Sequence, residues 1–320
     1  MRFVLIGAVG STLIALETMV EIGVPPICLF TLDAAKSKRH SDFVDLKPIA
    51  KRYNVPVKEI VNINAPDTLN AIANLNPDYI FVIGWSQICS KEFLSIPKKG
   101  VIGYHPSLLP ENRGRGVIPW TILQRKKETG STLFWIDEGL DSGDILAQES
   151  FKISLDETAT TLYRKHEDCL KKLLVGSIPK ILDGTAPRIP QDHSRATYCS
   201  KRIPDDGYID WNLPAESIWT LIRAVTHPYP GAFTFYKEKK VILWEADYIG
   251  EAPYFGLPGQ IQNVSKEGAL VQCGDRKHIL IKKIQLENEI EVSPEKFFKN
   301  HDKLGLDILT LYRKLITGGE

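Results

Sequence analysis

The chain has 320 residues, more than a single hydrophobic core usually supports, so its length favours one large and one small domain. Its 40 Lys and Arg residues nearly balance its 39 Asp and Glu residues, and the net charge of +1 gives no global attraction to a polyanion. The short basic runs at 36–40 and 125–127 are typical of solvated loops or helix faces.

The first part of the chain alternates short β-branched runs with amphipathic helical patterns. This alternation predicts a Rossmann-like α/β domain, with a mostly parallel sheet and helices on both faces. The expected strands are residues 3–6, 27–31, 79–83 and 100–103, and the expected helices are residues 11–22, 68–75 and 158–181. A Gly- and Pro-containing turn at 183–187 ends the last helix, so we expect this domain to cover residues 1–187.

A glycine turn follows the first expected strand and opens the first expected helix. Gly7 and Gly10 lie in this turn, and Asp33 follows the second strand, where dinucleotide-binding folds keep an acidic residue. The three-glycine fingerprint is broken, because Ser and Thr follow Gly10. A tight turn is therefore favoured, and a nicotinamide-dependent dehydrogenase is kept as a remote alternative.

A long loop motif begins where the fourth expected strand ends, over residues 103–116. It delivers His105 to the carboxyl end of a parallel strand, where open α/β sheets build their sites. Arg113 and Arg115 follow within reach of an anion bound there. This position favours His105 as a proton-transfer group, and a structural loop histidine is the alternative.

A second loop, residues 137–148, contains four carboxylates and two glycines after an apolar run at 133–136. It lacks the regular ligand spacing of a calcium loop, so no metal site is predicted. If Asp141 faces His105, the two side chains form a general acid/base unit in which the carboxylate orients the imidazole.

Periodicity is lost among Pro and polar residues at 188–204, which indicates a linker packed along the first domain. A second domain, residues 205–320, opens with a helix whose apolar stripe includes Ile218, Ile222 and Val225. Strands are expected at 232–236, 241–248, 259–264, 269–273 and 279–286. Short strands with Gly-bounded turns favour a small OB-like β-barrel, although their spacing also fits a sandwich.

The five cysteines form no C-x-x-C pair, which predicts reduced thiols, no zinc site and a cytoplasmic setting. The N-terminal apolar run is too short for a signal peptide, and no later run is long enough to cross a bilayer. We therefore expect no association with a membrane.

The two loop motifs together resemble the signatures of the 10-formyltetrahydrofolate-dependent formyltransferase family. The first is His-x-Ser-Leu-Leu-Pro followed by Arg-Gly, and the second is Gly-Leu-Asp-Ser-Gly-Asp at 139–144. Residues 206–211 and 222–233 resemble the start of that family's carboxyl-terminal domain, so the resemblance covers most of the chain. Within the family, the chain looks most similar to sugar-nucleotide N-formyltransferases.

The resemblance implies roles for individual residues. His105 polarises the formyl oxygen or stabilises the oxyanion, and Asp141 orients His105 and helps to manage the proton. The implied binding residues for the formyl donor are Trp85, Ser86, Gln87, Ile88, Gly139, Leu140 and Asp144. The family places an asparagine two residues before the histidine, where this chain has Gly103. Asn112, Ser107 or a bound water are the candidate replacements for that hydrogen-bond donor.

The near-neutral charge favours a nucleotide-linked amino sugar as the formyl acceptor, with a 4-amino-4,6-dideoxy sugar for surface glycans as the example. Methionyl-tRNA is the alternative acceptor, and nucleic acid binding is not expected. Tyr104, Ser107, Arg113 and Arg115 are the expected substrate-binding residues, and the run 36–40 could meet a diphosphate. The resemblance is also compatible with a homodimer.

Overall fold

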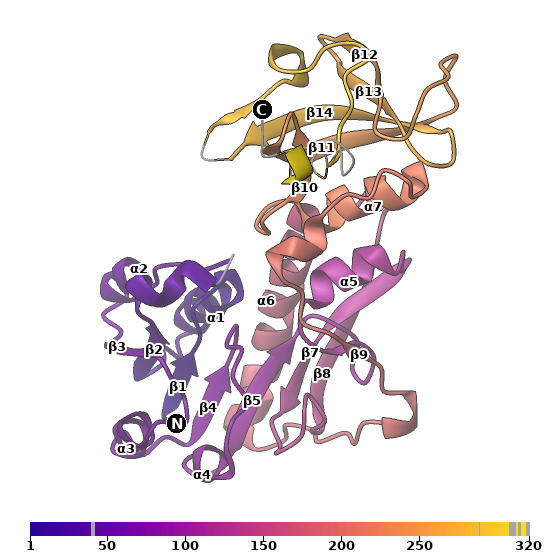
Figure 1. Ribbon diagram of the computed structural model, residues 1–320. Coiled ribbons are helices and arrows are strands. Elements are labelled where there is room, and N and C mark those ends of the chain that lie inside the picture. The colour runs from indigo at the N-terminus through magenta and orange to yellow at the C-terminus, as the bar shows by residue number, and fades with distance from the viewer. Residues whose placement is uncertain (40–41, 288, 307–311, 313–314, 318–320) are drawn as a thin grey trace. The chain divides into compact units, whose positions relative to one another are not determined.

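The computed structural model describes residues 1–39, 42–287, 289–306, 312 and 315–317 of the chain. The chain divides into two compact units, which are residues 1–155 with 161–202, and residues 156–160 with 203–320 (Figure 1). His40, from the basic run discussed above, lies outside the described residues. Among the described residues, no helix is both long enough and apolar enough to cross a membrane.

The first unit is built on a seven-stranded sheet with the order β3-β2-β1-β4-β5-β7-β8 (Figure 1). Five strands run parallel: β1 (Phe3–Ile6), β2 (Cys28–Leu32), β3 (Val57–Ile60), β4 (Tyr79–Val82) and β5 (Gly100–His105). Two antiparallel strands, β7 (Glu128–Trp135) and β8 (Ile145–Lys152), extend the sheet beyond β5. The predicted mostly parallel sheet is confirmed, and the sequence pattern had not identified β3, β7 and β8.

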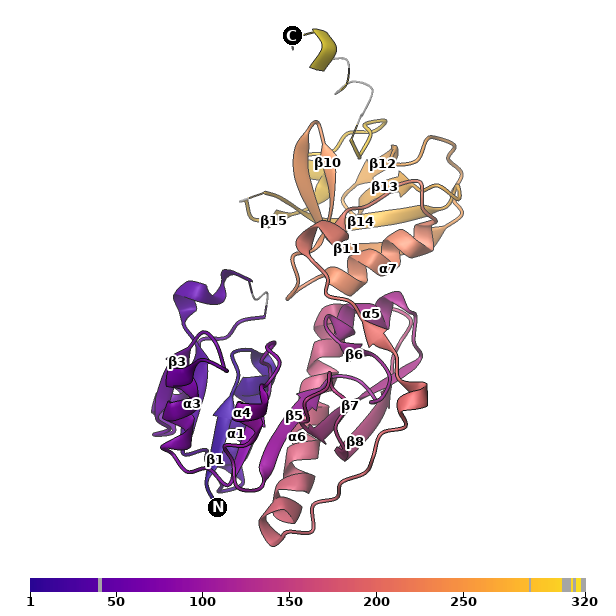
Figure 2. The ribbon, with the colours of Figure 1, turned by 60° about the horizontal axis from the view of Figure 1, so that its bottom comes forward.

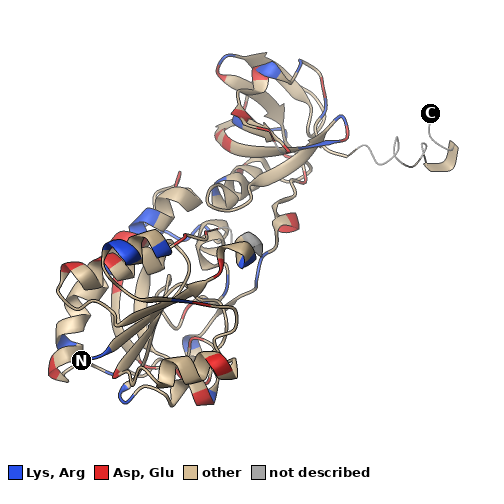
Figure 3. Ribbon diagram, turned by 90° about the vertical axis from the view of Figure 1, so that its left-hand side faces the viewer, with Lys and Arg blue, Asp and Glu red and all other residues tan. Residues whose placement is uncertain are grey.

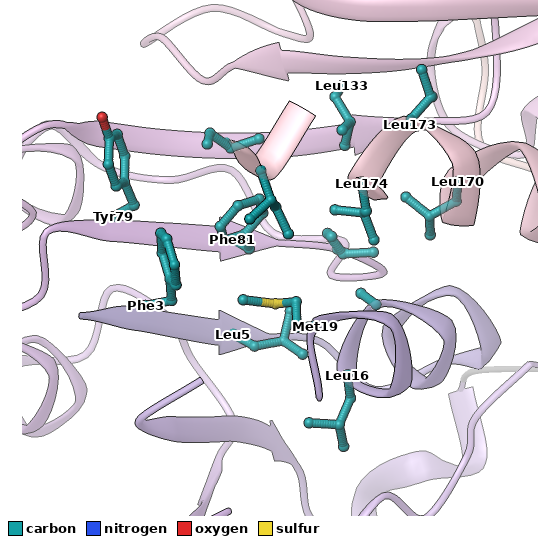
Figure 4. Close-up of a cluster of buried hydrophobic side chains, with 14 of the residues drawn as sticks. Phe3, Leu5, Leu16, Met19, Tyr79, Phe81, Leu133, Leu170, Leu173 and Leu174 are labelled. Atoms are coloured by element: carbon teal, nitrogen blue, oxygen red, sulfur yellow. The ribbon is translucent and has the colours of Figure 1, made fainter. Parts of the chain in front are cut away.

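Helices cover both faces of this sheet. On one face, Leu16 and Met19 of α1 (Gly10–Glu21) pack with Phe3 and Phe81 of the sheet (Figure 4). This core also takes in α2 (Lys47–Arg52) and α6 (Ala159–Asp183), and α3 (Pro66–Ala73) and α4 (Lys91–Leu94) cover the other face. A further helix, α5 (Val117–Leu123), follows the His105 loop. Residues at odd and even positions of one strand therefore meet different helices.

The glycine turn after β1 has a packing explanation. A Cβ atom on Gly7 would lie 1.9 Å from the carbonyl oxygen of Ile83 and 2.2 Å from Thr12 Oγ1, so no side chain fits there. Thr12 Oγ1 donates to that same Ile83 oxygen at 2.6 Å. The glycine is thus required by the close approach of the β1 and β4 ends.

Residues 188–202 run along the first unit. Ile189 forms an antiparallel bridge with Ile145, and β9 (Tyr198–Cys199) pairs in parallel with β6 (Arg113–Gly114). This path brings Gln191 and Thr197 beside the two motif loops.

The second unit contains helix α7 (Ala215–Val225) and an antiparallel sheet with the order β10-β11-β14-β13-β12 (Figure 2). The strands are β10 (Ala232–Tyr236), β11 (Lys239–Gly250), β12 (Ile261–Ser265), β13 (Gly268–Gln272) and β14 (His278–Leu286), and β15 (Glu291–Val292) pairs with β14. Register shifts between Leu243 and Gly250 bend β11. The expected smaller β domain after the α/β domain is confirmed, and its sheet is antiparallel. Across both units, the described residues also form the 3-10 helices η1 (Ala34–Arg39), η2 (His193–Arg195), η3 (Pro204–Gly207) and η4 (Pro294–Lys296).

All five cysteines are buried and free. Burial raises the pKa of the Cys28 thiol to about 11 and that of the Cys89 thiol to about 12, so both stay protonated at neutral pH. These thiols are small core residues rather than nucleophiles.

Candidate functional site

The carboxyl end of β5 places His105 against Asp141. His105 is 5% exposed and lies opposite Thr132 of β7 in the strand register. Its Nδ1 atom is 3.6 Å from Asp141 Oδ2, and its Nε2 atom is 2.7 Å from the carbonyl oxygen of Asn112. The structure therefore brings together the two residues that the sequence singled out for acid/base chemistry.

The partners of His105 define its hydrogen positions. A carbonyl oxygen only accepts hydrogen bonds, so His105 Nε2 carries a hydrogen and donates it to Asn112. The 3.6 Å separation of Nδ1 from Asp141 is an ion-pair distance that exceeds hydrogen-bond length. Asp141 Oδ2 also accepts the backbone N–H of Gly114 at 2.8 Å, which fixes the carboxylate beside the ring.

The Asp141 loop is held by a residue that sequence reasoning missed. Asp141 has a positive φ of 51°. Gln191 Nε2 donates to the carbonyl oxygens of Asp141 at 2.9 Å and Gly143 at 2.7 Å. Nothing in the local sequence marks Gln191, because its partners lie about 50 residues earlier in the chain.

Arg113 supports Gln191 rather than facing solvent. Its guanidinium donates to Gln191 Oε1 at 2.7 Å and 3.2 Å, and to Tyr198 at 3.2 Å. Arg113 is only 2% exposed and its contacts support the loop, and its expected role in substrate binding stays a prediction. Arg115 is exposed, and within the described part of the chain its guanidinium shows no hydrogen-bond or acidic partner. It is the cation of this motif that can meet an anion.

The loop after His105 is bonded internally and to the sheet. Ser107 Oγ donates to the Glu111 carbonyl oxygen at 2.7 Å, and Thr132 Oγ1 donates to the Ser107 carbonyl oxygen at 2.6 Å. Gln148 Nε2 donates to the Leu109 carbonyl oxygen at 2.7 Å, and the Leu109–Pro110 peptide bond is cis. Ser107 is 2% exposed and stabilises the loop, and its expected contact with substrate stays a prediction.

Tyr104 lies on the opposite sheet face from His105. Its hydroxyl is 3.0 Å from Ser131 Oγ and donates to the His166 carbonyl oxygen at 3.2 Å. Burial raises the pKa of the Tyr104 phenol. Strand alternation directs the side chains of Tyr104 and His105 to opposite faces of the sheet. The expected role of Tyr104 in substrate binding stays a prediction.

Gly103 leaves no space for the family's asparagine. A Cβ atom there would lie 2.8 Å from Ile136 Cγ1 and 2.8 Å from Phe134 Cε1. Phe134 faces Gly103 directly in the β5–β7 register and is 4% exposed. The two side chains considered as replacements for the asparagine's hydrogen-bond donor already have partners. Asn112 Nδ2 donates to Gln124 Oε1 at 3.0 Å, and Ser107 Oγ donates to the Glu111 carbonyl oxygen.

The residues expected to bind the formyl donor come from the loops after β4 and β7. Gln87 joins its loop to the segment after β3, since its side chain accepts from the Ile63 N–H at 2.8 Å and donates to the Val61 carbonyl oxygen at 2.7 Å. Ile88 is 63% exposed and Leu140 is 44% exposed. The indole Nε1 of Trp85 is buried and has no hydrogen-bond partner among the described residues. Exposed aliphatic groups and a spare N–H suit a flat heteroaromatic ligand.

The remaining residues expected to bind the formyl donor are Ser86, Gly139 and Asp144. Ser86 is exposed and Asp144 is half-buried, while the Gly139 N–H donates to Asp137 Oδ1 at 3.0 Å. Within the described ranges, no group of three or more His, Cys, Asp and Glu side chains is arranged to hold a metal ion.

Comparison with known proteins identifies both units. Residues 34–178 match the family model for formyl transferase, and residues 202–302 match the model for the formyl transferase C-terminal domain. The methionyl-tRNA formyltransferase of Acetivibrio thermocellus is 32% identical over 94% of this chain and 97% of its own length. That of Alkaliphilus oremlandii is 35% identical over 86% of this chain and 88% of its own length.

A solved N-formyltransferase from Helicobacter canadensis, in complex with folinic acid and dTDP-3-aminofucose, has the same fold. It is 19% identical, with a TM-score of 0.62, and the match covers 88% of this chain and 98% of that one. The chain belongs to the formyltransferase family and is a folate-dependent formyltransferase.

Proposed function

We propose that the chain transfers the formyl group of 10-formyltetrahydrofolate to a primary amine, with His105 and Asp141 as the catalytic residues. The proposal rests on one observation, the contact between His105 Nδ1 and Asp141 Oδ2 at 3.6 Å inside the segment matched by the formyl transferase model. The amine nitrogen forms a bond to the formyl carbon, and the bond from that carbon to folate N10 breaks. One amine proton passes to His105 Nδ1 and then to N10, so the step balances.

Asp141 stabilises the imidazolium that forms when His105 Nδ1 takes up the proton. Trp85, Ile88 and Leu140 are the residues we expect against the pterin ring of the donor. They offer apolar surface and one N–H that has no partner within the described part of the chain. Arg115 is the expected contact for a phosphate of the acceptor.

Methionyl-tRNA is the acceptor that the relatives favour. Methionyl-tRNA formyltransferases align with this chain over nearly their full length. This reverses the preference drawn from the sequence, which placed a nucleotide-linked amino sugar first.

A nucleotide-linked amino sugar is the second candidate, on the evidence of charge. Residues 203–320 contain 14 Lys and Arg against 17 Asp and Glu, so this part of the chain offers no net attraction to RNA.

The first experiment is a turnover assay with 10-formyltetrahydrofolate and a panel of amines. The panel contains methionyl-tRNA and UDP- and dTDP-linked amino sugars. We expect formylation of methionyl-tRNA, and a loss of at least about 100-fold in kcat for His105→Ala and Asp141→Asn. Asp67→Asn in the first turn of α3 is the control with the same charge change and should keep full activity.

Each other outcome has a meaning. Turnover of a nucleotide sugar alone would select the second acceptor. Near-full activity in either site variant would remove that residue from the mechanism. No turnover with any amine would contradict the proposed reaction.

A further inference from the structure

We infer that Asn112 is a positioning residue for His105: its main-chain carbonyl holds the ring hydrogen on Nε2 and leaves Nδ1 for the reacting groups. The inference rests on the proposed function for its catalytic consequence. Its structural part concerns the hydrogen position of one imidazole and can be measured without any substrate.

The contact that carries the inference is short and buried. His105 Nε2 lies 2.7 Å from the Asn112 carbonyl oxygen, and the two residues are 5% and 3% exposed. The carbonyl oxygen can only accept a hydrogen bond. In a His105 tautomer without hydrogen on Nε2, the Nε2 lone pair and this oxygen would be two buried acceptors in contact, which is unfavourable. The neutral ring therefore carries its single hydrogen on Nε2.

The direction of this carbonyl is set by an unusual backbone conformation. Asn112 has a φ of 55°, in the left-handed region that asparagine tolerates and that most other side chains avoid. Residues in this conformation turn the chain sharply. At this point the turn aims the carbonyl back at the ring.

Two side chains from elsewhere in the sequence hold the conformation. The Asn112 amide Nδ2 donates to Gln124 Oε1 at 3.0 Å, at the end of α5. The Asn112 backbone N–H donates to Thr197 Oγ1 at 2.8 Å, in the segment that runs along the first unit. Asn112 is thus tied on both sides, and its side chain is committed to Gln124 rather than to a ligand.

The tautomer decides which ring nitrogen can act as a base. With the hydrogen on Nε2, the lone pair of His105 lies on Nδ1, on the side of Asp141. Uptake of a proton at Nδ1 then forms an ion pair with the Asp141 carboxylate. With the hydrogen on Nδ1 instead, the lone pair would face the Asn112 carbonyl and could not receive a proton from the amine.

The experiment is nitrogen NMR of the protein labelled at the histidine rings, with no substrate present, followed by kinetics. In wild-type protein at a pH where the His105 ring is neutral, we expect the ring hydrogen on Nε2. Asn112→Gly keeps the positive φ and the main-chain carbonyl but loses the side-chain hydrogen bond to Gln124. Gln124→Leu removes the partner of the Asn112 amide. In both variants we expect a mixture of tautomers and a kcat lower by about 10- to 100-fold, with the KM for the folate donor unchanged.

Two further variants calibrate the result. Asn112→Asp keeps an oxygen that can accept from the Gln124 amide, so it should restore the wild-type tautomer and most of kcat. Asn54→Gly makes the same change at another left-handed asparagine, with φ of 56°, and should change neither measurement.

Hydrogen on Nδ1 in the wild type, or wild-type tautomer and kcat in both Asn112→Gly and Gln124→Leu, would overturn the inference. A wild-type protein with the expected tautomer and no formyl transfer would instead keep the inference about Asn112 and reject the proposed reaction.

Discussion

Gly103 and Phe134 act as one packing unit beside the site. They face each other in the β5–β7 register, and the ring of Phe134 occupies the space that a side chain on Gly103 would need. Gly103→Asn should therefore destabilise the protein by about 1–3 kcal/mol, because the buried ring has to move. Urea unfolding measures this change.

A double-mutant cycle tests whether Phe134 is the cause. Phe134→Ala opens the space, so the double variant should be more stable than the sum of the single effects, by a coupling of about 0.5–3 kcal/mol. Gly176→Asn is the matched control, because a Cβ atom at Gly176 in α6 meets no atom within 4 Å. If Gly103→Asn is as harmless as Gly176→Asn, the packing argument is wrong.

Whether the place of a motif residue could be predicted from sequence depended on how far away its hydrogen-bond partners lie in the chain. His105 was predictable because the carboxyl end of a parallel strand is where open sheets carry their sites. The buried contacts of Arg113 and Ser107 were not predictable, since their residue types fit a ligand as well as a buried contact. Arg113 is bonded to Gln191, which is 78 residues away, and no local pattern could indicate that pairing.

Strands β5 and β7 and helix α6 meet on the sheet face opposite His105. Tyr104 of β5 contacts Ser131 of β7 at 3.0 Å, and Ser131 Oγ is 2.9 Å from Nδ1 of His166 in α6. Each strand residue directly precedes a residue of the site face, His105 on β5 and Thr132 on β7. This polar contact therefore ties α6 to the two strands that carry the site.

Burial of His166 predicts a pH-dependent stability. Burial, with a smaller contribution from the charge of His105, lowers the pKa of His166 to about 3, so the folded protein binds fewer protons there than the unfolded chain between about pH 3 and 6.5. The free energy of unfolding should fall as the pH drops through this window, by at most about 1.4 kcal/mol per pH unit. Urea unfolding at several pH values measures this slope.

His166→Leu removes the titrating group and should flatten that slope, even though it also loses the contact with Ser131. His301→Asn, at an exposed histidine with a positive φ, is the control and should keep the wild-type slope. Equal slopes in wild type and His166→Leu would show that His166 does not govern acid stability.

The strands that sequence patterns missed have a physical explanation. β7 is buried along nearly its whole length, so it lacks the alternation of exposed and buried residues that marks a half-covered strand. β3, at the sheet edge, shows four residues with only Ile60 buried. The helices α1 and α6 were recognisable because each buries a regular apolar stripe against the sheet (Figure 4).

For the whole molecule, the distribution of charge bears on the acceptor. Residues 1–202 carry 26 Lys and Arg against 22 Asp and Glu, whereas residues 203–320 carry 14 against 17. Figure 3 shows basic and acidic segments interspersed along both units. Any contact with RNA phosphates should therefore depend on cations of the first unit, and α2 offers the exposed Lys51 and Arg52 in its last turn.

Salt dependence tests this placement. If methionyl-tRNA is the acceptor, its kcat/KM should fall as salt rises, because each phosphate contact releases counterions. Replacing both Lys51 and Arg52 with Glu should flatten the plot of log kcat/KM against log salt by about two units, since each cation contributes about one. Replacing Lys266 and Arg276, exposed cations of the second unit, with Glu makes the same charge change and should leave the slope unaltered. An equal loss of slope in both pairs would contradict the assignment to the first unit, and turnover of a nucleotide sugar with no salt-dependent tRNA reaction would make the sugar the acceptor.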